Sequence, residues 1–266
     1  MNNAALRRKK RRRAHKLFSV ALLILIPIIC FAVGKAGTGG QRGGASANPR
    51  QPSAPPANGP DAASPGSFAD DRGPFVNGGP EDWMVFLVNA ENPLPDGYRP
   101  VLKSLPNGLQ FDGRAIGPLN EMLSEMRGQG LSPIVCSAYR TIGYQSALFH
   151  AKASSLEASG LSSREADREA RKTVAYPGTS EHNLGLAADI VSSGYQTLDE
   201  KQADTREGRW LREHCAEYGF ILRYPKEKED ITGVQYEPWH FRYVGAEAAR
   251  DITGLGLCLE EYLKMQ

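Results

Sequence analysis

An uncharged, largely apolar run over residues 17–33, LFSVALLILIPIICFAV, constrains this chain more than any other feature, because it separates the N-terminus from the rest. A helix that crosses a membrane needs about 17–25 such residues, so the run lies at the lower limit of that length. The alternative is a signal peptide cleaved near Ala32-Val33-Gly34, which is a weak cleavage site. We expect an uncleaved signal-anchor segment over residues 17–34.

Basic residues are concentrated before this run. Residues 1–35 hold nine Lys and Arg residues and no acidic residue, whereas the rest of the chain has 23 basic against 30 acidic residues. Basic residues that flank an apolar segment stay in the cytoplasm, so residues 1–16 are predicted to be a cytoplasmic tail and the C-terminal bulk to lie outside the cell, attached to the membrane. Because the larger part is acidic, nucleic-acid binding by the whole protein loses its support, and we expect no nucleic-acid partner.

Residues 35–80 are rich in Gly, Pro, Ala, Ser and Asn and contain few large apolar residues. A segment of this composition cannot bury enough apolar surface to offset its ordering entropy, so we predict a disordered spacer. The folded domain is then residues 81–266, which is long enough for one hydrophobic core. A spacer between membrane and domain suits a domain that must reach an extended substrate.

Hydrophobic periodicity within the domain predicts short helices and strands in irregular alternation. Leu119, Met122, Leu123 and Met126 follow the spacing of one helix face. The predicted helices are 118–127, 144–158, 163–174, 210–218 and 246–253, and the predicted strands are 133–138, 185–192, 220–224 and 239–244. This order favours an α+β domain with a small, mostly antiparallel sheet flanked by helices.

Three cysteines lie beyond the apolar run, at positions 136, 215 and 258, and no two are close enough in sequence for a zinc knuckle. We expect them to be small buried apolar residues. A disulfide between Cys215 and Cys258 remains open.

Two segments carry residues that are suited to catalysis or metal binding, SEHNLGLAAD over 180–189 and EPWHFR over 237–242. A catalytic zinc site uses three nitrogen or oxygen ligands and leaves one position open for water. His182, Asp189 and His240 can supply these ligands. Glu237 would then be free to act as a general base.

The spacing imposes two conditions on this site. Glu237 and His240 are three residues apart, so on a regular strand they would point to opposite faces, and a turn at Pro238-Trp239 must bring them together. His182 and Asp189 are seven residues apart, which suggests a loop at Gly185 that leads into a strand. By spacing alone, a surface or structural pair of His and carboxylate remains an equal alternative.

Further motifs in fixed order accompany these segments. They are Val88-Asn89-x-x-Asn92-Pro93-Leu94-Pro95, Ser137-x-Tyr139-Arg140 with Gln145, Pro177-Gly178-x-Ser180, and Tyr218-Gly219-Phe220-Ile221-Leu222-Arg223-Tyr224-Pro225. Together with S-x-H-x-x-G-x-A-x-D and E-x-W-H-x-R they resemble the D-alanyl-D-alanine carboxypeptidase family of the vancomycin-resistance type. That family belongs to zinc peptidases that include lysostaphin-like enzymes and hedgehog domains, and the resemblance covers roughly residues 85–250.

The resemblance implies a hedgehog/DD-peptidase-like fold and one Zn²⁺ held by His182, Asp189 and His240. It makes Glu237 the base and lets Arg140 polarise the scissile carbonyl and hold the oxyanion.

Three residues are implied to bind the substrate, namely Gln145, Ser180 and Trp239. Ser180 has an equal alternative as a turn cap, and Trp239 has one as a core residue. Arg242 reads equally as a carboxylate ligand and as a structural ion pair.

The implied activity is removal of the C-terminal D-alanine from peptidoglycan stem peptides by a monomer. The alternatives are L,D-carboxypeptidase action on tetrapeptide stems, an endopeptidase that cuts cross-links, and a non-hydrolytic cell-wall-binding module.

Overall fold

The computed structural model describes residues 82–266. The predictions for the tail, the signal-anchor segment and the spacer, over residues 1–16, 17–34 and 35–80, lie outside the described residues. Within residues 82–266, no helix combines the length and the apolar character that a membrane crossing requires.

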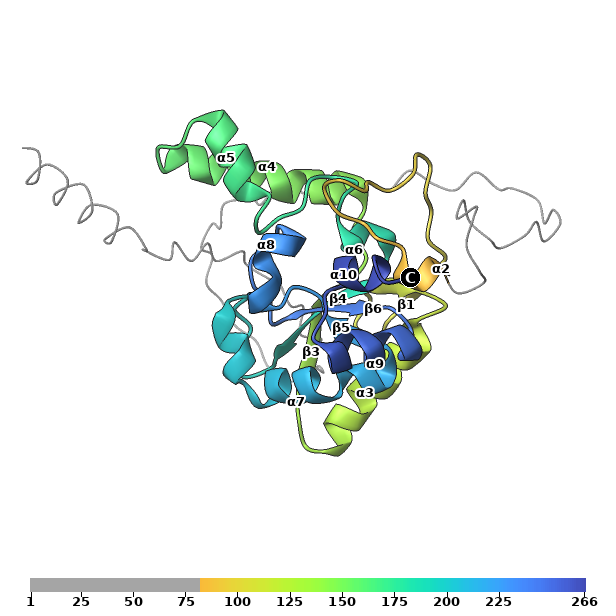
Figure 1. The fold of residues 1–266 in the computed structure, drawn as a ribbon. Helices are drawn as coiled ribbons and strands as arrows, with labels where there is room; N and C mark the ends of the chain where they lie inside the picture. Colours follow the sequence, from red (N-terminus) through yellow and green to blue (C-terminus); the bar gives the residue numbers. More distant parts are fainter. Residues whose placement is uncertain (1–81) are drawn as a thin grey trace, which may run out of the picture. The chain divides into compact units, whose positions relative to one another are not determined.

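A four-stranded sheet forms the centre of the domain, in the order β3-β4-β6-β5 (Figure 1). Its strands are β3 (Pro133–Ser137), β4 (Ala187–Ser192), β6 (His240–Tyr243) and β5 (Phe220–Leu222). All neighbouring strands pair antiparallel, as expected from the sequence. Every residue of β4 is buried, and because alternate residues of a strand face opposite sides, both faces of this strand are covered. A two-stranded sheet, β1 (Leu102–Ser104) with β2 (Gln110–Asp112), is the second sheet.

Helices surround the sheet, which confirms the predicted α+β class. The α-helices are α2 (Asp82–Val85), α3 (Ile116–Gly128), α4 (Ile142–Ala158), α5 (Ser163–Ala170), α6 (Glu181–Leu184), α7 (Arg206–His214), α8 (Glu229–Thr232), α9 (Ala246–Leu255) and α10 (Leu259–Leu263). The 3₁₀ turns are η1 (Glu200–Asp204), η2 (Cys215–Tyr218) and η3 (Lys226–Lys228). The predicted apolar face of α3 is buried in the main core. Helices α4 and α5 pack through a separate small cluster and extend away from the sheet (Figure 1).

The bounds of two predicted helices differ by four residues at one end, more than those of the other three. Helix α5 begins with the expected Ser162 cap but ends at Ala170. The amides of Lys172 and Thr173 bond to the carbonyls of Glu169 and Ala170, three residues back, so the regular ladder of bonds four residues apart ends there. The helix predicted over 210–218 starts earlier, at Arg206, because Thr205 caps the amide of Gly208. It ends in the 3₁₀ turn η2 and then at Gly219, as the sequence indicated.

All three cysteines of the described residues are free, so the open possibility of a Cys215–Cys258 disulfide is wrong. Both are buried, as expected for small apolar residues. Burial raises the pKa of Cys215 to about 12 and that of Cys258 to about 11, so both stay thiols. Cys136 is half-buried, and its thiol donates to the carbonyl oxygen of Asp189 at 3.4 Å.

Candidate metal centre

Two short-range features and one pairing of strands place the candidate ligands. Ser180 accepts a hydrogen bond from the amide of His182 and so begins α6, a single helical turn that presents His182. Gly185 ends this turn with a φ of 91°, a left-handed conformation that glycine adopts without strain, and the chain then enters β4. In the sheet, Asp189 of β4 is paired directly with His240 of β6. Because paired residues share one face, their side chains meet.

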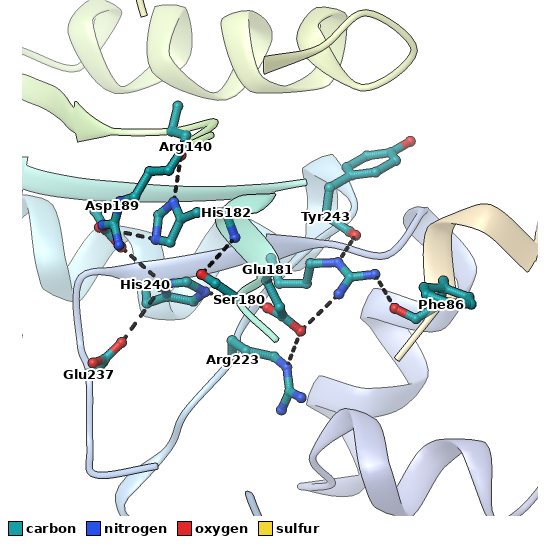
Figure 2. A network of polar contacts seen from close by, with 12 residues as sticks. Phe86, Arg140, Ser180, Glu181, His182, Asp189, Arg223, Glu237, His240 and Tyr243 are labelled. Atoms are coloured by element: carbon teal, nitrogen blue, oxygen red, sulfur yellow. Dashed lines mark hydrogen bonds and ion pairs between the residues drawn. The ribbon is translucent and has the colours of Figure 1, made fainter. Parts of the chain in front are cut away.

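The three side chains form one compact group. One ligand atom from each of His182, Asp189 and His240 lies within 4.8 Å of the other two, and all three residues are buried. Asp189 Oδ2 lies 3.2 Å from His182 Nε2, and Asp189 Oδ1 lies 3.0 Å from His240 Nδ1 (Figure 2). Two imidazole nitrogens and one carboxylate are a donor set typical of catalytic zinc.

The outer nitrogen of each imidazole is anchored away from the group. His182 Nδ1 lies 2.6 Å from the carbonyl oxygen of Ala138, to which it must donate, and this leaves the lone pair of Nε2 directed at Asp189. His240 Nε2 lies 3.4 Å from Glu181 Oε2, while Nδ1 faces Asp189. Metal-binding histidines in proteins are oriented by such outer contacts. The residues therefore fit a metal ion.

Glu237 lies beside this group on the turn that the sequence required. The amide of His240 donates to the carbonyl oxygen of Glu237 at 3.1 Å, which closes the turn at Pro238-Trp239. Glu237 Oε2 lies 3.8 Å from His240 Nδ1, and 12% of its side chain is exposed. Burial raises the pKa of Glu237 to about 8. A carboxylate with a pKa near neutrality is suited to take up a proton.

Arg140 contacts the candidate ligand Asp189 directly. Its Nη2 donates to Asp189 Oδ2 at 2.7 Å and its Nε to Ser137 Oγ at 2.8 Å. Its Nη1 makes a longer bond of 3.3 Å to Gln145 Oε1. Gln145 is only 1% exposed and also donates to the carbonyl oxygen of Ala175, so both ends of its amide are engaged within the protein. Gln145 thus orients Arg140, and its contact with substrate stays a prediction.

Ser180, Trp239 and Arg242 are the remaining residues for which the sequence left two roles open. Ser180 is the cap of α6, in agreement with the turn-capping alternative, and it is buried. Trp239 is half-buried on the turn beside Glu237, and its carbonyl oxygen accepts from the amide of Ile190. Arg242 is fully buried in an ion pair with Glu181, which agrees with its structural reading. Substrate contacts by Ser180 and Trp239 stay predictions.

Burial and neighbouring charges shift the pKa values of all three candidate ligands. Burial, reinforced by the charge of Arg140, lowers the pKa of His182 to about 4. Burial opposes ionisation of Asp189, but the contacts with His182, His240 and Arg140 outweigh it and hold the Asp189 pKa well below its ordinary range. Burial also opposes protonation of His240, yet its bonds to Asp189 and Glu181 raise its pKa to about 9. His182 is thus neutral and Asp189 ionised at neutral pH, as metal binding requires, whereas His240 is protonated and must release a proton when a metal ion binds.

The sequence matches one family model, VanY D-alanyl-D-alanine carboxypeptidase, over residues 109–246. A D-alanyl-D-alanine carboxypeptidase of Enterococcus faecalis is 44% identical over 189 residues, which cover 71% of this chain and 69% of that protein. The chain belongs to the VanY family. The putative carboxypeptidase YodJ of Bacillus subtilis is 37% identical over 193 residues, which cover 68% of this chain and 67% of that protein.

Solved structures agree with this VanY-family assignment. VanYB in complex with D-alanine-D-alanine has a TM-score of 0.64 at 44% identity and covers 69% of this chain and 99% of that one. A VanY variant of the VanB-type resistance cassette, in complex with Zn(II), has a TM-score of 0.62 at 45% identity and covers 68% and 99%. The L,D-carboxypeptidase LdcB has a TM-score of 0.58 at 37% identity and covers 67% and 84%.

Two further residues of this VanY-family chain contact His240 of the candidate ligand group. Neither of them was assigned a role from the sequence. The ring of Tyr224 lies 4.9 Å from that of His240, centroid to centroid, and burial raises the Tyr224 pKa well above its ordinary value, so its hydroxyl stays neutral. Glu181 contacts His240 from the outer side. The only signal for Glu181 was its place between the cap Ser180 and the ligand candidate His182.

Proposed function

We propose that this chain is a zinc-dependent D-alanyl-D-alanine carboxypeptidase that removes the C-terminal D-alanine from peptidoglycan stem peptides. The observation that carries the proposal is the buried group of His182, Asp189 and His240 with Glu237 beside it. The group offers three ligands for one ion, and the fourth acidic side chain is left for proton transfer.

When bound, zinc supplies a Lewis acid for the scissile carbonyl and lowers the pKa of the attacking water. Glu237 accepts the proton of that water and later passes it to the leaving amine. Its low exposure and its raised pKa suit it to hold a proton between these two steps.

Arg140 is proposed to stabilise the negative charge that develops on the carbonyl oxygen. Its Nε and Nη2 are held by short bonds to Ser137 and Asp189, which fix the plane of the guanidinium. Its Nη1 makes the longest of the three bonds, to Gln145, and is the nitrogen most easily redirected to a substrate oxygen. A cation whose plane is already fixed in this way stabilises an oxyanion with little reorganisation.

L,D-carboxypeptidase action on tetrapeptide stems is the second candidate, because LdcB has a similar fold at 37% identity. The 44% identity to the Enterococcus faecalis enzyme over most of the domain favours D,D-cleavage. A non-hydrolytic module is disfavoured, because the ligand candidates and Glu237 are all present.

Incubation of the full chain and zinc with defined pentapeptide and tetrapeptide muropeptides, followed by mass spectrometry, tests this proposal. We expect loss of one terminal alanine from the pentapeptide and none from the tetrapeptide. Cleavage of the tetrapeptide alone would establish the L,D-activity instead. An unchanged mass for both substrates would contradict hydrolysis.

We further propose that residues 17–34 anchor the protein in the cell membrane, with residues 35–80 as a spacer and the domain outside the cell. The support is the uncharged apolar run preceded by basic residues and followed by a Gly- and Pro-rich segment. Peptidoglycan lies outside the membrane, so this arrangement would bring the catalytic domain to its substrate.

A further inference from the structure

Behind His240, on the side away from Asp189, lies a buried cluster of four charged side chains: Glu181, Arg223, Arg242 and Glu260. Glu181 Oε1 accepts from Arg223 Nε at 2.7 Å and from Arg242 Nη1 at 2.8 Å. Arg223 also donates to both oxygens of Glu260, on the C-terminal helix α10, at 2.9 and 2.6 Å. Figure 2 shows Glu181 between His240 and Arg223.

Stability alone does not account for this cluster. The side chains of Glu181, Arg223 and Arg242 are fully buried and that of Glu260 is 8% exposed, so four charges have been removed from water. Apolar side chains of similar volume often stabilise a core as well as or better than such pairs do. The two acids and the two bases balance in charge, and one oxygen is left over for another partner.

That oxygen is Glu181 Oε2, which lies 3.4 Å from His240 Nε2. Guanidinium groups only donate hydrogen bonds, so the two arginines fix Oε1 as an acceptor. Two guanidinium groups within hydrogen-bond distance of Oε1 favour the ionised form of Glu181, and an ionised carboxylate accepts at both oxygens. Nε2 of His240 must therefore carry a proton, so Nδ1, which faces Asp189, is the nitrogen that gives up its proton when a metal ion binds.

We propose that Glu181 is a positioning residue for the metal centre, which fixes the Nε2–H tautomer of His240 so that Nδ1 is free to bind the metal ion. Arg223 and Arg242 hold Glu181, and Glu260 ties Arg223 to the C-terminal helix. This inference rests on the proposed metal site and assigns a residue outside its ligand set.

The change Glu181→Gln isolates this role, since glutamine has the same shape but only one acceptor oxygen. That oxygen must stay on the side of the two arginines, because neither can accept a bond. The amide nitrogen then points at His240 Nε2, which must accept, and the imidazole proton moves to Nδ1. The variant selects the tautomer that cannot bind the metal through Nδ1.

Zinc affinity of the full chain, measured by competition with a chromogenic chelator, is the test. Loss of an outer contact to a metal ligand costs about 10–100-fold in affinity, and we expect a loss of this size in Glu181→Gln. Glu207→Gln is the matched control. Glu207 is also buried, and its Oε1 accepts a hydrogen bond from the amide of Ser132 at 2.9 Å, away from the candidate ligands. We expect it to keep the zinc affinity of the original protein.

Glu260→Gln separates positioning from general weakening of the cluster. It removes a carboxylate from the same Arg223 without touching His240, so it should reduce the melting temperature but change zinc affinity less than Glu181→Gln does. Equal losses of zinc affinity in the two variants, or unchanged affinity in Glu181→Gln, would overturn the proposal.

A second measurement does not depend on a variant that must fold. In the ¹⁵N-labelled, zinc-loaded full chain, NMR should find the His240 proton on Nε2, and a proton on Nδ1 would refute the inference. Zinc binding and hydrolysis by the unaltered chain report on the proposed function separately. If both are present while Glu181→Gln binds zinc normally, only the positioning role fails.

Discussion

The change Glu237→Gln tests whether Glu237 acts as a base and not as a ligand. The two side chains have nearly the same shape, but the amide cannot take up a proton. We expect the variant to keep zinc, because one ligand atom from each of His182, Asp189 and His240 already lies within 4.8 Å of the others without Glu237. Hydrolysis should fall by about 10²–10⁴-fold, the usual contribution of a general base. This corresponds to about 3–5 kcal/mol in the activation free energy.

The same substitution has a consequence for stability that follows from burial. The pKa of Glu237 is raised from its ordinary 4.5 to about 8. A group whose folded pKa is raised contributes stability that is fully present below its unfolded pKa and is lost as the pH rises through its folded pKa. The loss therefore falls between about pH 4.5 and pH 8. At 1.36 kcal/mol per pKa unit it amounts to about 5 kcal/mol.

Chemical denaturation of the chelator-treated full chain at pH 4 and pH 9 measures this loss. His182 and His240 also titrate, so the informative quantity is the difference in unfolding free energy between the original protein and Glu237→Gln. The variant should gain about 2–5 kcal/mol relative to the original protein as the pH rises, because an isolated buried ion costs several kcal/mol. Parallel pH profiles for the two proteins, or near-normal hydrolysis by the variant, would refute the reasoning.

Three further predictions address the ligands, Arg140 and the location of the domain. His240→Ala should lose most of its zinc in metal analysis, since two of three ligands remain, and full occupancy would contradict the ligand assignment. Arg140→Lys keeps the charge but cannot reproduce the three bonds to Ser137, Gln145 and Asp189. Its kcat should fall by about 10²–10³-fold with zinc content and melting temperature level, whereas a lower melting temperature with unchanged kcat would assign Arg140 to structure. Protease treatment of intact cells should cut residues 37–80 and release a soluble active fragment, and activity found only in the cytosol would exclude an external domain.

Local patterns in the sequence were sufficient for most of the individual elements. The apolar spacing of α3 and the Ser162 cap of α5 depend on neighbours within four residues, so they can be read directly. The same holds for the Glu237–His240 turn, because proline and the required side-chain directions leave no regular strand there. The residue types of the proposed metal site followed from the segments 180–189 and 237–242 and from their resemblance to a known family.

The bounds of weaker elements depended on competition between bonds. Val174 has the spacing to continue α5, but the amides of Lys172 and Thr173 before it already bond three residues back. The single turn α6 is too short for any periodicity to show. Its existence depends on the cap at Ser180 and on Gly185, which follows it.

Only the tertiary structure decided which side chains meet in the site. The sheet order pairs β4 with β6, and this register places Asp189 opposite His240, 51 residues away. The same packing buried Gln145 against Arg140 and turned Glu181 toward two arginines and His240. Sequence periodicity specifies which face of an element is apolar, but a buried charge is stable only beside partners that compensate it. Those partners come from segments far apart in the chain, so they are fixed only when the strands and helices have assembled.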